Sequence, residues 1–456
     1  INKIDLVDEE WLKLVELDVQ DLIDGSFLNN QKIYKVSTTE NLGIDELKSC
    51  LQSLSNINSL DLNNDRGLFR LYIDRSFSQQ GFGTVVTGTA ISGAVDVGES
   101  LVALPASKTV RLRSAQSHHK NVQTISVRDR AALNLNGIEL KEIGRGGHLS
   151  NLEAFKPISM FLATISLLDI KNASLSQNQR LRFHIGTSEV IGRISICSEN
   201  IVDRGDSCIC LIKLEKSVII AFKDKFLIRS YSPMRTIGGG VVEDIDCIGK
   251  WKSIKEYASK LIKIDSVENK MNFIIESRLG FPLKFIDIQM RFGMSFDKVI
   301  SCLNKNKKYK LIEFQNEKWI VTYKQLETFL DIVVKSIEDF HSKNPYRSGV
   351  LKKELYQKVK SDILFFDFCI GLLIDQEKIE RDKEIIRIKG FKINLSTEEI
   401  AVQEKVLNIL DEQGFCSQNY IQIASSLNIS AEKLKLLINI AEKDQKIIRI
   451  NEDLLF

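Results

Sequence analysis

Residues 229–243 read RSYSPMRTIGGGVVE, and residues 68–89 read LFRLYIDRSFSQQGFGTVVTGT. Around both stretches, short runs of Val, Ile, Thr and Leu are broken by glycine about every 5 to 10 residues. Closely spaced short strands with glycine between them are typical of all-β barrels. We therefore predict two β-barrels, one over residues 66–150 and one over residues 151–249.

Composition limits the class of protein. Hydrophobic residues make up 43% of the 456 residues and charged residues 27%, as expected of a soluble, globular chain of several domains. No apolar run approaches the ~20 residues of a membrane span, so we expect no transmembrane helix. The eight cysteines show neither C-x-x-C spacing nor a histidine partner pattern, which argues against zinc and against a disulfide scaffold. We predict a cytoplasmic protein with no metal site in this chain.

The N-terminal region differs from the β-rich middle. Apolar residues recur at helical spacing over 11–22 and 43–54, and residues 32–36 look like a strand. Residues 1–60 therefore read as a piece of an α/β sheet. The sequence opens on Ile1 with neither an initiator Met nor a signal region, so we expect a chain cut at its N-terminus.

The C-terminal region carries a weak repeat. From residue 251 the pattern turns helical, and glycine-centred breaks at 279–281, 348–350 and 413–415 lie 69 and 65 residues apart. Short strand pairs follow each group of helices, at 309–321, 378–388 and 446–455. Three helices plus a hairpin form a winged helix, a helix-turn-helix variant. We predict winged-helix modules over 255–323, 324–396 and 397–456; the alternative is a helical array that serves only as a spacer.

Charge divides the chain unevenly. The net charge is −8 over residues 1–65, +6 over residues 66–249 and +5 over residues 250–456. The two later regions are therefore the better candidates for contact with a polyanion.

A nucleotide-binding motif lies at the start of the chain. Asn2, Lys3 and Asp5 match the N-K-x-D signature, in which the Asp carboxylate accepts two hydrogen bonds from guanine and the Lys stem packs along the base. Ser37 and Thr38 follow at the spacing of the second guanine-contacting loop, although Thr38 replaces the usual Ala. For the four-residue match alone, a solvated turn after a strand is the alternative.

The sequence lacks the motifs with which a GTPase hydrolyses its nucleotide. No G-x-x-x-x-G-K-[ST] phosphate loop and no upstream D-x-x-G switch occur in the sequence, so we expect no GTP hydrolysis and assign no catalytic residue. The glycines at 238–240 follow a strand pattern and precede another, which favours a tight strand connection over an anion-binding loop.

Several segments carry a family resemblance. Residues 93–101 (GAVDVGESL), 110–118 (VRLRSAQSH) and 130–135 (RAALNL) resemble the second domain of the selenocysteine-specific elongation factors, which are translational GTPases. Residues 180–188 (RLRFHIGTS) and the opening 229–243 stretch resemble the third domain of that family. The winged-helix tail separates this family from elongation factor Tu and the initiation factors, which share the barrels.

The resemblance implies a fold and a function. The fold class is multidomain α+β: a remnant of an α/β GTPase domain, two β-barrels and tandem winged-helix modules, with a fourth module of the family absent from this chain. The function implied is GTP-dependent delivery of selenocysteinyl-tRNA to the ribosome at UGA codons specified by an mRNA hairpin. GTP is the cofactor implied, with Mg²⁺ in the intact protein whose ligands are not in this chain, and we expect a monomer.

By the same resemblance, Asp74, Arg75, His118 and Arg130 correspond to the selenocysteine pocket. A selenol is ionised at neutral pH and a serine hydroxyl is not, so guanidinium groups on a desolvated wall favour selenocysteine. Asp74 would hold the arginine geometry. On sequence alone, Arg75 and Arg130 read as ordinary barrel-surface charge, and the neighbouring His119 leaves the histidine assignment open by one position.

Basic residues in the third module are candidates for RNA contact. They are Lys433, Lys435, Lys446 and Arg449. Acidic residues interleave with them, so a mixed solvated face is the alternative. A second function also stays open, namely a winged-helix nucleic-acid-binding protein without GTPase ancestry whose barrels serve as a ligand or dimerisation module.

Overall fold

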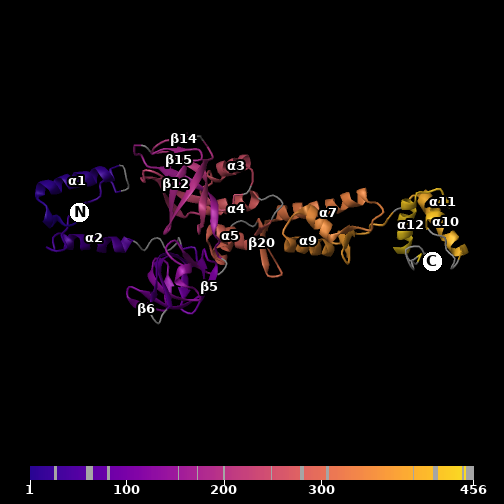
Figure 1. Cartoon of the computed structure of the whole chain (residues 1–456), viewed down its shortest axis with the longest axis horizontal. Coiled ribbons are helices and arrows are strands. Elements are labelled where there is room, and N and C mark those ends of the chain that lie inside the picture. The colour runs from indigo at the N-terminus through magenta and orange to yellow at the C-terminus, as the bar shows by residue number, and fades with distance from the viewer. Residues whose placement is uncertain are drawn as a thin grey trace.

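The computed structural model describes most of the chain in thirteen ranges. These are residues 1–24, 28–57, 65–79, 83–151, 154–171, 173–198, 201–247, 249–277, 282–304, 308–393, 395–413, 420–443 and 446–447. Along the long axis of the molecule, two N-terminal helices are followed by the two barrels and then by a helical arm that carries the C-terminus (Figure 1).

The N-terminal segment is helical. It consists of the 3₁₀ turn η1 (Ile4–Leu6), α1 (Glu9–Ile23) and α2 (Ile44–Ile57). Asp8 caps α1 by accepting a hydrogen bond from the backbone N–H of Trp11 at 2.8 Å. Glu9 and Glu10 in the first turn of α1 add a favourable interaction with the helix dipole.

The strand expected over residues 32–36 does not form. The Val36 N–H donates to the Ile1 carbonyl at 2.9 Å, and the Ile4 N–H donates to the Val36 carbonyl at 3.3 Å. Ile4 is already the first residue of η1, so the pairing ends there. The strand predicted over residues 32–36 is therefore wrong, and the described residues of this segment hold η1, α1, α2 and one isolated bridge between Ser37 and Leu42. A strand needs an extended neighbour along its length, and residues 4–6 do not supply one.

The first barrel is closed by six strands. The ring runs β4-β9-β1-β2-β8-β5, and the pairing of β4 with β5 closes it. Its elements, with the short strand β6 and the separate pair β3 and β7, are β1 (Arg70–Gln79), β2 (Gly83–Ser92), β3 (Ala94–Asp96), β4 (Ser100–Leu104), β5 (Lys108–Ser117), β6 (Lys120–Val122), β7 (Thr124–Ser126), β8 (Arg130–Asn136), η4 (Leu140–Glu142) and β9 (His148–Ser150). Alternate side chains fill the interior, including Leu71, Ile73, Val86 and Leu133.

The second barrel is also a closed ring of six strands, in the order β10-β15-β13-β12-β16-β17. Its elements, with the separate pair β11 and β14, are β10 (Ile158–Leu167), β11 (Leu175–Ser176), β12 (Arg180–Ile185), β13 (Ser188–Ile196), β14 (Ile201–Val202), β15 (Ser207–Val218), β16 (Lys225–Ser230) and β17 (Thr236–Asp244). In its core, the ring centroid of Phe226 lies 5.9 Å from that of Phe161 and 5.9 Å from that of Phe183. The two barrels predicted from the sequence are confirmed.

The glycines at 238–240 do not form a connection between strands, because all three lie within β17. A Cβ on Gly238 would come within 2.4 Å of the Ser166 carbonyl oxygen, and one on Gly240 within 2.4 Å of the Phe226 ring. The glycines therefore let β17 approach its neighbours closely. The tight strand connection predicted for these glycines is therefore wrong.

The arm contains two modules in which helices surround a three-stranded sheet. The sheets are ordered β18-β20-β19 and β21-β23-β22. The elements are α3 (Trp251–Leu261), α4 (Val267–Ser277), β18 (Leu283–Lys284), α5 (Phe285–Phe292), α6 (Phe296–Asn304), β19 (Tyr309–Phe314), β20 (Glu317–Thr322), α7 (Tyr323–Lys343), β21 (Val350–Leu351), α8 (Lys352–Val359), α9 (Ile363–Asp375), β22 (Ile379–Asp382) and β23 (Ile385–Ile388). Three helices with a hairpin are the winged-helix layout predicted from the repeat.

A third helical group ends the described chain. It contains α10 (Thr397–Gln413), α11 (Tyr420–Ser426) and α12 (Ala431–Lys443), packed around Val406, Ile423 and Leu434. The hairpin predicted over residues 446–455 lies almost wholly outside the described residues.

Candidate functional site

The two candidate guanine loops meet at Asp5. The Thr39 hydroxyl donates to Asp5 Oδ2 at 3.3 Å, and the hydroxyls of Ser37 and Thr39 are 3.0 Å apart. The hydrogen bond from Ser37 lowers the pKa of Asp5, which therefore stays a carboxylate. Segments 34 residues apart in the sequence are thus joined around one exposed carboxylate that can accept hydrogen bonds.

Of the other predicted guanine contacts, Lys3 lies near this carboxylate, since its charge also lowers the pKa of Asp5. Lys3 adopts a left-handed backbone conformation with φ of 62°, and its N–H donates to Asn2 Oδ1 at 2.7 Å. Thr38 is exposed beside the fully buried Ser37. Thr39 was not predicted. The one signal for it in the sequence is a second hydroxyl two residues after Ser37.

Two of the predicted pocket residues form an ion pair on the outer wall of the first barrel. Arg130 Nη1 donates to Asp74 Oδ2, and Thr87 Oγ1 donates to Asp74 Oδ1 at 2.7 Å. The three residues come from the neighbouring strands β1, β2 and β8. Each oxygen of the carboxylate therefore accepts from a different strand.

The electrostatics of this wall favour an ionised Asp74. Partial desolvation on its own raises the pKa of Asp74, but hydrogen bonds from Arg130 and Thr87 and the charges of Arg130 and Arg75 outweigh it, so the pKa lies below its ordinary value. The Arg130 side chain is 53% exposed, and Arg75 is exposed as well. The wall thus presents guanidinium groups to solvent, where an anionic ligand can meet them.

His118 and His119 together form the turn between β5 and β6. Ser117 pairs with Lys120, and the two histidines have φ of 50° and 64°. Two consecutive positive φ values identify a two-residue type I′ hairpin turn. The turn adjoins the start of β8, because Ser117 Oγ donates to the Arg130 carbonyl at 3.1 Å. Both imidazoles are exposed, and within the described ranges no hydrogen bond ties either of them to Asp74 or Arg130.

A buried ion pair joins the two barrels. Arg70 donates to both oxygens of Asp224, at 2.9 and 2.7 Å, and Arg66 lies 3.4 Å from the same carboxylate. The Arg70 side chain is 1% exposed. Burial alone would raise the pKa of Asp224, but the guanidinium of Arg70 and then that of Arg66 hold it below its ordinary value. Sequence reasoning missed this pair because its members lie 154 residues apart.

Aromatic rings pack around this joint between the barrels, which is formed by Arg66, Arg70 and Asp224. Tyr72 donates through its hydroxyl to the Ile219 carbonyl at 3.3 Å, and the buried ring of His148 packs against Tyr72 at 5.0 Å. Burial and then the charge of Arg70 lower the pKa of His148, so the imidazole is neutral. His148 is therefore a structural residue of the joint.

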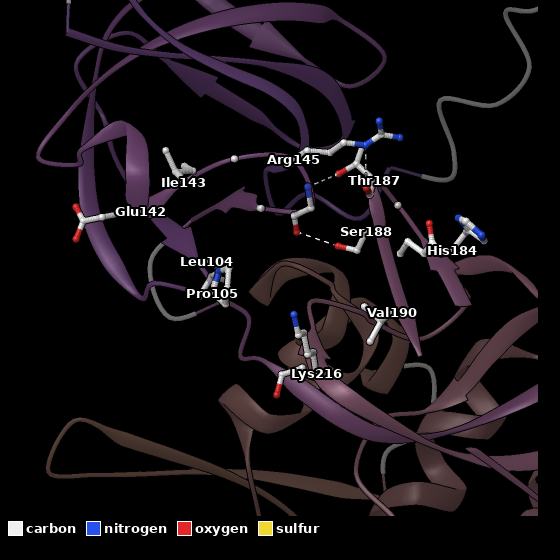
Figure 2. A pocket seen from close by; sticks show the side chains of 16 residues that line it. Leu104, Pro105, Glu142, Ile143, Arg145, His184, Thr187, Ser188, Val190 and Lys216 are labelled. Atoms are coloured by element: carbon white, nitrogen blue, oxygen red, sulfur yellow. Dashed lines mark hydrogen bonds between the residues drawn. The ribbon is translucent and has the colours of Figure 1, made fainter. Parts of the chain in front are cut away.

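A cleft of about 630 Å³ lies beside the joint, between the two barrels (Figure 2). Two hydrogen bonds join the walls of the cleft. Ser188 Oγ donates to the Gly146 carbonyl at 3.0 Å, and the Gly146 N–H donates to Thr187 Oγ1 at 3.1 Å. Figure 2 shows Lys216 reaching in from the second barrel, with Leu104 on the wall of the first. The cleft is thus bordered by fixed contacts between the barrels, and its lining includes apolar, cationic and anionic side chains.

Three of the predicted RNA-binding residues, Lys433, Lys435 and Lys446, lie in the third helical group. Lys433 Nζ lies 3.4 Å from Glu399 Oε1, and Lys435 and Lys446 are exposed. Hydrogen bonds from the backbone of Ser396 and from the Tyr346 hydroxyl lower the pKa of Glu399 to about 2. Lys433 thus has an internal partner although its side chain is half exposed, and Lys435 is exposed on the same helix, α12. Arg449 lies outside the described residues.

Two negative findings concern the described part of the chain. It contains no helix long and apolar enough to cross a membrane. Its His, Cys, Asp and Glu side chains form no cluster of three or more that could hold a metal ion.

Family models match three parts of the chain. "Elongation factor Tu domain 2" matches residues 83–150, "Selenocysteine-specific elongation factor, beta-barrel domain" matches residues 163–247, and "Elongation factor SelB, winged helix" matches residues 334–388. These matches fall on the first barrel, the second barrel and the second winged-helix module, respectively.

Individual relatives agree with the family models. A selenocysteine-specific elongation factor of Desulfomicrobium baculatum is 24% identical over 99% of this chain and 72% of its own length. One of Methanocaldococcus jannaschii is 31% identical over 59% of this chain and 61% of its own length. The crystal structure of a bacterial selenocysteine-specific elongation factor matches 99% of this chain and 80% of its own, with a TM-score of 0.67 and 21% identity, which shows a shared fold. The resemblance read from the sequence is confirmed.

Proposed function

Because the chain belongs to the selenocysteine-specific elongation factor family, we propose that it serves in GTP-dependent delivery of selenocysteinyl-tRNA to the ribosome. The delivery takes place in the cytoplasm, at UGA codons that an mRNA hairpin specifies. A winged-helix protein without GTPase ancestry is not favoured, because both barrels match barrels of elongation factors.

The observation that carries this proposal is the Asp74 and Arg130 pair on the outer wall of the first barrel. Asp74 accepts a hydrogen bond from one guanidinium nitrogen of Arg130. The remaining N–H groups of this half-exposed side chain can then bind a ligand. A selenolate carries a charge that the serine hydroxyl lacks, so the guanidinium favours the selenocysteinyl cargo. Arg75 adds a second positive charge to the wall, and the His118 turn stands beside it.

The test compares two aminoacyl-tRNAs. In the full-length protein with GTP bound, Arg130→Ala should weaken binding of selenocysteinyl-tRNA by about 10-fold or more, because a charge-assisted hydrogen bond is lost. Binding of seryl-tRNA should change far less. Arg113→Ala is the matched control, since Arg113 is an exposed arginine on β5 of the same barrel. Equal losses for both tRNAs in the Arg130 variant would show that the pocket lies elsewhere.

We further infer that Asp5 holds the guanine base of GTP, with Asn2, Lys3, Ser37 and Thr38 around it. The support is the meeting of the two loops at the Asp5 carboxylate. Asp5→Asn should weaken GTP binding at least about 10-fold in a calorimetric titration, because an amide offers only one acceptor to the two guanine donors. An unchanged affinity would remove Asp5 from the site.

The arm is proposed to reach toward the mRNA hairpin. Lys435 and Lys446, two exposed cations of the third helical group, support this contact. Neutralising both should weaken RNA binding and flatten its salt dependence, because fewer counterions are released. A mixed solvated face would leave the salt dependence unchanged.

A further inference from the structure

We propose that Thr87 is a positioning residue that holds Asp74 in the orientation from which it directs Arg130 toward the cargo. The inference rests on the proposed function, because it concerns the same wall of the first barrel. Nothing in the family match assigns a role to Thr87. It acts through Asp74 and need not touch the ligand.

The backbone leaves Asp74 without a paired residue. Ile73 pairs with Gly88 and Arg75 pairs with Thr87, so the register of β1 and β2 shifts at Asp74. An extra residue of this kind re-aims its side chain relative to the regular alternation of the strand. The direction of the Asp74 carboxylate therefore depends on side-chain contacts.

Thr87 supplies one of the two contacts that fix this carboxylate. Its hydroxyl donates to Oδ1 at 2.7 Å, while Arg130 donates to Oδ2. A hydroxyl-to-carboxylate bond is charge-assisted and stronger than a neutral one. Thr87 also sits on the middle strand, paired with Arg75 on one side and Ala132 on the other.

Threonine is suited to this task. Its branched Cβ restricts χ1, so the hydroxyl is pre-aimed, and its half-buried position on a regular strand limits movement further. The terminal torsion of an aspartate is broad by comparison. Without the hydroxyl, the carboxylate can rotate, and the half-exposed Arg130 can follow it away from the ligand.

The first experiment removes the hydroxyl and then restores it. Thr87→Val keeps the shape and suits a strand; it should weaken selenocysteinyl-tRNA binding by about 3- to 10-fold, the worth of one hydrogen bond. Thr87→Ser should stay within about 2-fold of the parent, because it keeps the donor. Thr109→Val on β5 is the control, since Thr109 is an exposed strand threonine of the same barrel. Thr87→Ala replaces the valine variant if that variant does not fold.

A double-mutant cycle separates positioning from mere structure. In an Asp74→Ala background, Thr87→Val should cause no further loss, because the residue it acts through is gone. The same fold-loss in both backgrounds would overturn the inference, as would a Thr87→Val variant that binds like the Thr109 control. If Arg130→Ala weakens both aminoacyl-tRNAs equally, the proposed pocket fails instead, so the two failures are distinguishable.

Discussion

Two arginine and aspartate pairs start from the same strand, β1, and differ in burial. Arg70 pairs with Asp224 of the second barrel, with side chains 1% and 10% exposed. Four residues on, Asp74 pairs with Arg130 of the same barrel, with side chains 26% and 53% exposed. The first pair is shielded from water and holds domains together, whereas the second faces solvent and can meet a ligand.

The strongest way to break this contrast is to remove one buried charge. Asp224→Asn should lower the free energy of unfolding of the barrels by about 3 to 5 kcal/mol, because it leaves Arg70 buried without its counter-charge. Denaturant unfolding followed by circular dichroism measures the change. Glu215→Gln is the control, since its pair with Arg180 is exposed and should leave the midpoint unchanged. A small loss of unfolding free energy in Asp224→Asn would mean that water reaches this ion pair between the barrels.

The second largest effect tests how tightly the barrels meet. Gly186 has φ of 54°, and an added Cβ would lie 2.6 Å from the Tyr72 ring in the other barrel. Gly186→Ala should therefore cost about 2 to 4 kcal/mol of unfolding free energy, from backbone strain and overpacking. Gly205→Ala has φ of 78° but its nearest neighbour at 3.7 Å, so it isolates the strain. Equal costs in the two variants would argue against a packed interface.

A smaller effect is expected from pH. The pKa of Asp224 is lower in the folded protein than in the unfolded chain, so its stabilising contribution is present above the unfolded value of about 3.9. That contribution is lost as the pH falls through the lower folded value. Between about pH 5 and pH 3 the parent should lose stability more steeply than Asp224→Asn, which has no carboxylate at this position. Parallel pH profiles would show that Asp224 does not titrate with unfolding.

The smallest effect on stability is expected at the exposed pair. Arg130→Ala should change the unfolding free energy by at most about 0.5 kcal/mol, because solvent screens this half-exposed pair. Its effect on the preference for selenocysteinyl-tRNA should nevertheless be large. Differential scanning calorimetry beside the binding assay measures both. A destabilisation as large as that of Asp224→Asn would show that Arg130 stabilises the fold, and the contrast between the buried and the exposed pair would not hold.

Much of the fold was predictable, for reasons that differ along the chain. The barrels follow from short β-branched runs and glycine breaks, and the winged helices follow from a repeat of helices and hairpins. The strand over residues 32–36 was predicted wrongly, because a strand exists only with a neighbour, and local propensity does not supply one. The glycines at 238–240 lie inside β17 because of neighbouring strands that the local pattern does not reveal.

The charged residues of the candidate sites were predictable from the sequence, but the threonines that hydrogen-bond to them were not. Asp74 and Arg130 were singled out by resemblance, and the structure joins them directly. Thr87 and Thr39 were missed, because a threonine on a strand or in a loop has no distinctive spacing. The turn of His118 and His119 was also unexpected, and it explains why two consecutive residues compete for one assignment.

The order of barrels and winged helices follows from the sequence alone, as do the residue types that can bind an anion or a guanine base, because both depend on local pattern and side-chain chemistry. Which arginine of β1 and β8 is buried and which faces solvent depends on how the barrels pack. Burial is set by the groups that pack against a strand, and these can come from anywhere in the chain. For Arg70 that is Asp224, which lies 154 residues away in the other barrel.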